Sequence, residues 1–276
     1  MQVHSIISNT ISEEILQTGH LSIRFMADGF SLLLEDKNYN PVVLNRFTDE
    51  ALPTKINIVA ACEDWLNRHT LIDDFYGEIT IVSDTLASTF IPSELFSEES
   101  TGLYLENITT LHPGNAVAFK EIKSRPYVLV YAFSEIVNEL KNKFKGVCRV
   151  YPVAHVLLSV ADQVNASDHQ RGFAIIEVQN DSLTILLIKN DELELVNQLK
   201  LKNTEEVVYH SLNTLHQLNF KRDTSPVFLT GSIYKDELST LEKYIQHISP
   251  LNYIQKGIDK EAITEHIVLA EASKCE

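Results

Sequence analysis

The sequence predicts an α/β protein with mixed sheets, built from a duplicated βββαβαβα unit. Two triplets of short apolar or alternating segments are joined by tight turns, as in strand meanders. Each triplet is followed by helical and strand-like segments in alternation, and a meander followed by βα crossovers gives a mixed sheet with helices on its faces. The chain has 276 residues, of which 44% are hydrophobic and 22% charged, enough for one large domain or two ordinary ones.

The first half of the chain begins with three strands and a helix. Its pattern predicts strands at Leu21–Met26, Phe30–Glu35 and Pro41–Phe47, a helix over Thr54–Arg68 and a β-branched strand at Glu78–Val82. Residues 84–125 interrupt the pattern and are predicted to form an insertion that contains a hairpin. The unit is then expected to continue with strand Tyr127–Phe133, helix Ser134–Phe144, strand Val147–Tyr151 and helix Val153–Asp162.

The second half repeats this order. We expect strands at Phe173–Val178, Thr184–Ile188 and Leu193–Leu201, then a helix that opens near the cap-like Asn203 and runs to about Leu218. The remaining elements are a strand at Pro226–Leu229, a helix over Lys235–His247, a short strand at Leu251–Ile254 and a last helix over Lys260–Ser273. The duplication predicts two similar lobes, 1–165 and 170–276, with a cleft between them and residues 162–170 as the linker.

The composition argues against several classes of function. The chain has 38 acidic and 23 basic residues, a formal charge of −15, so its surface repels phosphate backbones and a nucleic-acid partner is not expected. It has only 9 glycines, spaced at least ten residues apart. Phosphate-cradling loops built from paired glycines are therefore absent from the sequence.

Targeting segments and disulfides are not expected either. The first ten residues lack the basic and apolar regions of a signal peptide. The densest apolar stretches, 127–133 and 153–161, are much shorter than the roughly 20 residues that a membrane span needs. Three cysteines without CxxC spacing favour reduced thiols. The sequence thus predicts a cytoplasmic protein with no membrane insertion.

The order of elements resembles a known superfamily. A duplicated βββαβαβα unit is the layout of the actin, sugar-kinase and heat-shock-protein ATPases, which have two ribonuclease H-like lobes. Four segments carry a closer resemblance, to an uncharacterised family of the Bacteroidetes that is a domain of unknown function with an actin-like ATPase fold: FIPSELF (90–96), IIEVQNDSLTILLI (175–188), VVYHSLNTLHQL (207–218) and FLTGS (228–232). The chain is similar, more distantly, to actin-like pilus and type II secretion assembly proteins, which recruit partners at the membrane.

The resemblance implies where a nucleotide would bind. Nucleotide-hydrolysing members place an Asp-x-Gly turn between the first two strands of each lobe, where Asp organises Mg²⁺ or water and Gly admits the phosphates. The first turn here has an Asp and a Gly with no residue between them, and the second has Gln at the glycine position. The adenosine-side turn has one glycine where two are usual. The cofactor-binding candidates, by resemblance, are Asp28, Gly29, Glu177, Gln179, Thr184, Thr230 and Gly231.

These residues also have plainer interpretations. Asp28-Gly29 is a typical hairpin turn, which turn chemistry favours, and Glu177 can lie on the polar side of its strand. His155, in an apolar helix, is expected to be a core histidine. No HExxH or GxSxG motif occurs, so no metal ligand or catalytic residue is expected. The eroded turns favour a non-enzymatic scaffold or adaptor with an unknown protein partner, without a cofactor, as a monomer or homodimer. The alternative is an atypical switch or ATPase that binds ATP and Mg²⁺.

Overall fold

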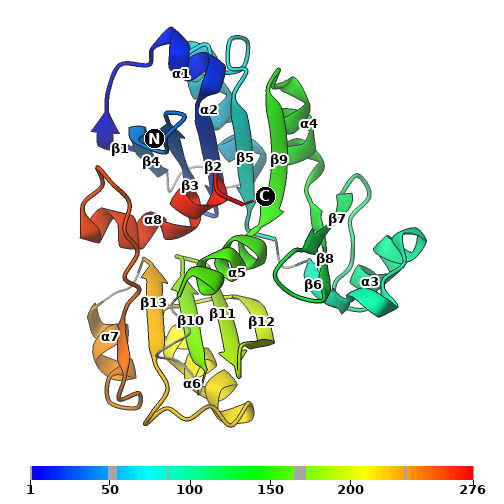
Figure 1. Ribbon diagram of the computed structural model, residues 1–276, viewed down its shortest axis with the longest axis vertical. Helices are drawn as coiled ribbons and strands as arrows, with labels where there is room; N and C mark the ends of the chain where they lie inside the picture. The colour runs from blue at the N-terminus through cyan, green and yellow to red at the C-terminus, as the bar shows by residue number, and fades with distance from the viewer. Residues whose placement is uncertain (1, 49–54, 86, 165–171, 233–234, 276) are drawn as a thin grey trace. The chain divides into compact units, whose positions relative to one another are not determined.

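The computed structural model describes residues 2–48, 55–85, 87–164, 172–232 and 235–275. The chain divides into two compact units (Figure 1), of which unit 1 is Met1–His155 with Ala272–Glu276 and unit 2 is Val156–Glu271. This division falls inside helix α5 (Val153–Gln163), whereas the sequence analysis divides the repeats after residue 165. From residue 165 onward, the predicted linker lies outside the described residues.

Unit 1 contains a six-stranded mixed sheet in the order β1-β4-β3-β2-β5-β9. The strands from β1 to β2 in this order pair antiparallel, whereas β2, β5 and β9 pair parallel. Helices α1 (Glu13–Thr18), α2 (Lys55–Arg68) and α4 (Glu135–Lys143) belong to the same unit. The strand bounds are β1 (Gln2–Ser8), β2 (His20–Met26), β3 (Gly29–Glu35), β4 (Pro41–Thr48), β5 (Glu78–Ser83) and β9 (Val147–Pro152).

The sequence analysis does not predict β1 or α1. Strand β1 is exposed at nearly every position, so no alternation of apolar and polar residues marks it. Helix α1 has six residues, too few to show a helical period, although the Ser12 side chain caps it by accepting a hydrogen bond from the Ile15 amide at 3.4 Å. Both elements are held by the sheet and its neighbouring loops rather than by a strong local pattern.

The insertion in unit 1 forms its own three-stranded antiparallel sheet, in the order β6-β8-β7. Because β8 is its central strand, the expectation that Tyr127–Phe133 continues the main repeat is wrong. Both faces of β8 are buried: α3 covers one, and on the other Tyr131 donates a hydrogen bond to the Val150 carbonyl of β9 at 2.7 Å. The elements of the insertion are β6 (Ser88–Pro92), 3₁₀ turns Ser93–Leu95 and Glu98–Ser100, α3 (Thr101–Glu106), β7 (Ala116–Ile122) and β8 (Tyr127–Phe133).

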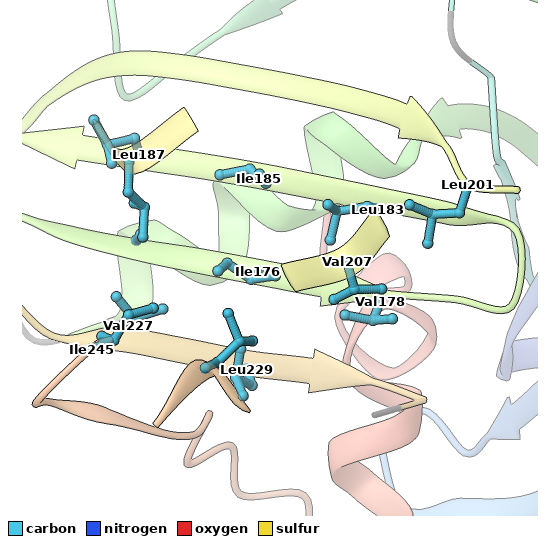
Figure 2. Packing of buried hydrophobic residues seen from close by; sticks show 13 residues of the cluster. Ile176, Val178, Leu183, Ile185, Leu187, Leu201, Val207, Val227, Leu229 and Ile245 are labelled. Atoms are coloured by element: carbon cyan, nitrogen blue, oxygen red, sulfur yellow. The ribbon is translucent and has the colours of Figure 1, made fainter. Parts of the chain in front are cut away.

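Unit 2 contains a five-stranded mixed sheet in the order β12-β11-β10-β13-β14. Helices α6 and α7 cover one face, where alternate strand residues such as Ile176 and Val178 form a continuous apolar core (Figure 2). The bounds are β10 (Phe173–Val178), β11 (Ser182–Lys189), β12 (Glu192–Lys200), α6 (Glu205–Gln217), β13 (Val227–Gly231), α7 (Lys235–Leu241), β14 (Ile248–Pro250) and α8 (Lys260–Ala272).

Two elements of unit 2 differ from their prediction. The last strand is Ile248–Pro250, paired parallel with β13, and not Leu251–Ile254. The alternation that suggested the later strand is real, since Leu251 and Tyr253 are buried and Ile254 is 84% exposed, but no strand ladder includes it. Helix α7 ends at Leu241 and not at His247, because turns replace the helix over the following residues.

The two main sheets share one topology. In the orders β4-β3-β2-β5-β9 and β12-β11-β10-β13-β14, three antiparallel strands are followed by two parallel strands. In each repeat, one helix (α2 or α6) lies between the third and fourth strands and one (α4 or α7) precedes the fifth strand, and another (α5 or α8) follows it; α3 belongs to the insertion. The predicted mixed α/β class and its internal duplication are therefore confirmed.

Candidate functional site

The first hairpin of unit 1 carries the candidate residues Asp28 and Gly29 between β2 and β3. Arg46, from the neighbouring strand β4, donates two hydrogen bonds from its Nη2 atom to the Asp28 carboxylate, at 2.6 and 2.8 Å. The Nη1 atom of the same guanidinium lies 3.1 Å from the sulfur of Met26. The Asp28 side chain is 23% exposed, so this charged hydrogen-bonded pair ties a partly solvated turn to the next strand.

Gly29 is required by the sheet itself. A Cβ atom at this position would lie 1.9 Å from the carbonyl oxygen of Phe47 in β4, so no side chain fits between the two strands. The close backbone approach explains the glycine without any ligand. In this hairpin, the glycine and the aspartate thus both have partners in β4.

In unit 2, three candidate residues form a polar row across neighbouring strands. In the strand register, Glu177 of β10 lies opposite Thr184 of β11 on one side and Thr230 of β13 on the other. Their neighbours in sequence belong to the apolar core, so these three side chains point to the opposite face of the sheet. All three are buried, with exposed fractions of 1% or less. A carboxylate in such a row needs hydrogen-bond donors to remain charged.

Gln179 supplies one of these donors. Its Nε2 atom donates a hydrogen bond to Oε1 of Glu177 at 2.8 Å, and its own backbone amide donates to the Ser182 carbonyl across the turn at 2.8 Å. The Thr230 hydroxyl donates to the Thr264 carbonyl of α8 at 2.7 Å. The Thr184 hydroxyl is buried and has no hydrogen-bond partner among the described residues. Within the row, Oε1 of Glu177 and the Thr230 hydroxyl thus have partners in unit 2.

Gly231 ends β13 in a left-handed conformation, with φ of 85°. A Cβ atom there would lie 2.1 Å from the Val178 carbonyl oxygen, which also accepts a hydrogen bond from the Ser232 amide at 2.8 Å. The turn therefore uses its one glycine to let two backbones approach. The structure places Asp28 with Gly29 in unit 1. In unit 2, it groups Glu177, Gln179, Thr184, Thr230 and Gly231 around the ends of adjacent strands.

Two residues that hydrogen-bond between elements, Arg46 and Glu271, are not among the candidates from the sequence. Arg46 binds Asp28, and its signal is that it is the one charged residue of strand β4, PVVLNRFT. Glu271 of α8 is fully buried and accepts hydrogen bonds from Ser159, Gln163 and Tyr253, at 2.5, 2.6 and 2.7 Å. Its signal is a single carboxylate in the apolar run 267–272. Glu271 ties α8 to α5 and to the segment before α8.

The titratable groups of the described residues offer little for catalysis. Burial raises the pKa of the Cys148 thiol to about 12 and also raises the pKa of Cys62, which keeps both thiols protonated and weakly nucleophilic. Burial, with a smaller effect of Lys120, lowers the pKa of His155 to about 4. Neither ring nitrogen of His155 has a hydrogen-bond partner in the described part of the chain. No group of three or more metal-ligating side chains occurs among these residues.

Solved structures share the fold of this chain. A Bacteroides thetaiotaomicron protein with an actin-like ATPase fold and unknown function is 20% identical, with a TM-score of 0.81; the match covers 97% of this chain and 100% of that chain. The PilM–PilN type IV pilus biogenesis complex contains a chain that is 15% identical, with a TM-score of 0.65 and coverage of 92% and 97%. The ethanolamine utilization protein EutJ of Carboxydothermus hydrogenoformans is 8% identical, with a TM-score of 0.54 and coverage of 98% and 93%.

These likenesses confirm the predicted actin-like ATPase fold. No curated protein matches the chain. Within the described residues, no helix is both long enough and apolar enough to cross a bilayer. The model of a family described as "Protein of unknown function (DUF3822)" matches residues 8–248, so the chain belongs to this family.

Proposed function

We propose that this protein is a non-enzymatic scaffold or adaptor, an actin-like fold whose phosphate-binding turns have become part of the sheets. The observation that carries the proposal is that both candidate carboxylates have partners within their own unit. Asp28 is bound by Arg46, and Oε1 of Glu177 accepts a hydrogen bond from Gln179. A carboxylate that is already paired with a guanidinium is a poor ligand for Mg²⁺, because the cation must displace the existing partner.

The backbone of the turns supports the same proposal. Phosphate loops bind through free backbone N–H groups that point at the anion. Here the amides of Gln179 and Ser232 donate hydrogen bonds to carbonyl oxygens of their own sheet. These two amides are therefore not available to a nucleotide. By its resemblance to the superfamily, the chain also has the side chain of Gln179 where a glycine would admit a phosphate.

The solved structure of the PilM–PilN complex gives further support. The matching chain of this complex has a similar fold, and it is assembled with a partner in type IV pilus biogenesis. An actin-like fold can thus serve as an assembly component, although a fold alone does not fix a function. We carry over only this general role, the recruitment of a protein partner.

The proposal is tested by assays of nucleotide turnover and binding. The purified protein, incubated with ATP and Mg²⁺, is expected to release no phosphate above the level of a Glu177→Gln variant. ATP, ADP and GTP are expected to leave the melting temperature unchanged. A turnover that Glu177→Gln abolishes would overturn the proposal, because Glu177 would then act in catalysis.

One observation favours the alternative, an atypical nucleotide-dependent switch. The buried Thr184 hydroxyl lies next to Glu177 and has no hydrogen-bond partner among the described residues. A bound ligand could satisfy it. Calorimetric titration with ATP and Mg²⁺ separates the two proposals: the switch predicts a heat of binding that Thr184→Val reduces, and the scaffold predicts none.

A further inference from the structure

The insertion of unit 1 exposes large aliphatic side chains around helix α3. Leu95 is 70% exposed, Leu103 58% and Ile108 49%. The same short segment keeps Leu105 fully buried, so the exposed residues are not the result of a poorly packed insertion. Apolar side chains that gather on one small surface indicate a site of interaction more often than single exposed ones do.

The geometry of α3 explains why these side chains point outward. Leu105 packs against the three-stranded sheet, and Leu103, two residues earlier, lies about 200° around the helix and hence on its outer side. The Tyr104 hydroxyl accepts a hydrogen bond from the Ser97 amide and donates one to the Leu95 carbonyl, both at 2.9 Å. Leu95 and Leu103 therefore flank the same tyrosine.

Carboxylates border this apolar surface, which we name the α3 face. Glu106, three residues after Leu103, lies beside it on the outer side of α3, and Glu99 lies in the 3₁₀ turn Glu98–Ser100 immediately before the helix. The acidic residues of the α3 face are all exposed, and none has an ion-pair partner among the described residues. The α3 face consists of Leu95, Leu103 and Ile108 with Glu94, Glu98, Glu99 and Glu106.

The insertion contains fewer cations than carboxylates. Its three basic residues, Lys120, Lys123 and Arg125, lie in β7 and the turn that follows it, and the chain has no other lysine or arginine after Arg68 until Arg125. The four carboxylates of the α3 face outnumber these cations, so the charge of the region is negative. Nucleic acid and anionic lipid surfaces are repelled by such a face, whereas a cationic protein segment is attracted.

We propose that the α3 face binds a basic amphipathic helix of a partner protein; this rests on the proposed scaffold function and names the chemistry of its partner. The aliphatic side chains bury the apolar stripe of the partner helix, and the surrounding carboxylates meet its lysines and arginines. Burial supplies most of the affinity, because exposed ion pairs contribute little to it. The carboxylates chiefly accelerate association and make it sensitive to salt.

A model helix tests this chemistry directly. The probe is a fluorescein-labelled 18-residue peptide of leucine and lysine, with leucines at helical spacing, and its binding to the full chain is followed by fluorescence anisotropy. The control peptide has glutamate in place of lysine and is not expected to bind.

Leu103→Ser is expected to raise the Kd at least tenfold. Glu99→Lys with Glu106→Lys is expected to slow association at least tenfold and to remove its salt dependence.

Matched variants in unit 2 separate this face from the general acidity of the chain. Ile254→Ser replaces another exposed aliphatic residue, and Glu192→Lys with Glu242→Lys makes the same change of net charge. Both are expected to bind the lysine peptide as the wild type does. All these positions are exposed, so unchanged circular dichroism spectra should accompany each result.

Three results would overturn the inference. They are no binding of the lysine peptide, equal binding by Leu103→Ser and Ile254→Ser, or equal binding of the two peptides. None of them bears on the phosphate-release assay. A protein that hydrolyses ATP through Glu177 would end the scaffold proposal, even if the α3 face bound the peptide.

Discussion

The first hairpins of the two units share a topology, but their candidate carboxylates stand at different positions and have different partners. In unit 1, Asp28 lies in the turn itself, is partly exposed and pairs with the cation of Arg46. In unit 2, Glu177 lies in strand β10 and is buried, and its Oε1 atom accepts a hydrogen bond from the neutral amide of Gln179. The two carboxylates therefore differ in position, in burial and in the charge of the partner.

This comparison teaches that burial decides how a carboxylate responds to its surroundings. A partly exposed ion pair is stabilised weakly and responds to salt, whereas a buried carboxylate depends on every donor that it retains. The two carboxylates should therefore respond differently to substitution and to salt.

The largest effect is expected at two glycines, Gly29 in the first hairpin of unit 1 and Gly231 at the end of β13 in unit 2, which should behave alike. Gly29→Ala and Gly231→Ala each force a Cβ atom to within about 2 Å of a backbone oxygen, and both glycines have a positive φ, of 154° and 85°. We expect each to lower the free energy of unfolding by more than about 3 kcal/mol. Trp65, the one tryptophan of the chain, reports on the unfolding of unit 1, and hydrogen exchange of β10 reports on unit 2.

Gly102→Ala is the matched control for the glycine variants. No atom lies within 4 Å of the added Cβ, and the residue is inside helix α3, so we expect a gain of about 1 kcal/mol. If Gly29→Ala or Gly231→Ala were as stable as the wild type, the close backbone approaches would not be the reason for these glycines. The sheets would then not require a glycine at either position.

The second largest effect is expected in the pH dependence of stability, because His155 is buried in unit 1. The pKa of His155 is lowered to about 4 by its burial, whereas the unfolded chain takes up this proton near pH 6.5. Stability from this residue is therefore fully present above pH 6.5 and falls as the pH drops towards 4, by about 3 kcal/mol in total. Urea unfolding of wild type and His155→Leu over this range measures the difference, and the wild type should lose more. Parallel pH curves would contradict the burial of a neutral histidine.

Local sequence patterns predict most of the repeated elements, because each element has its own periodicity of apolar residues or is bounded by a polar turn. Alternating apolar residues and a short polar turn indicate strands such as β10 and β11. The same signal fails for β8, since a continuous apolar run has the same appearance in a central strand of the main sheet and in a small insertion sheet. Pairing between distant strands decides which sheet it joins.

The sequence predicts where the candidate turns lie but not which contacts their side chains make. Asp28 and Glu177 are candidates by resemblance to the superfamily, yet the sequence does not show that Arg46 reaches Asp28. That contact depends on the register of β3 against β4, which shifts near Glu35. Glu271 was missed for a similar reason: its donors come from α5 and from Tyr253, both distant in sequence.

The smallest effects separate the two carboxylates directly. Gln179→Met keeps the size of the side chain but removes the donor to a buried carboxylate, so we expect a loss of about 2 kcal/mol in the free energy of unfolding. Asp28→Asn weakens a partly exposed pair, with an expected loss of about 1 kcal/mol in dilute buffer. In 1 M NaCl, the loss for Asp28→Asn should shrink, since salt screens the pair, whereas the loss for Gln179→Met should persist because its hydrogen bond is buried. Urea unfolding at both salt concentrations measures all four values. Equal salt sensitivity of the two losses would mean that burial does not distinguish the two carboxylates.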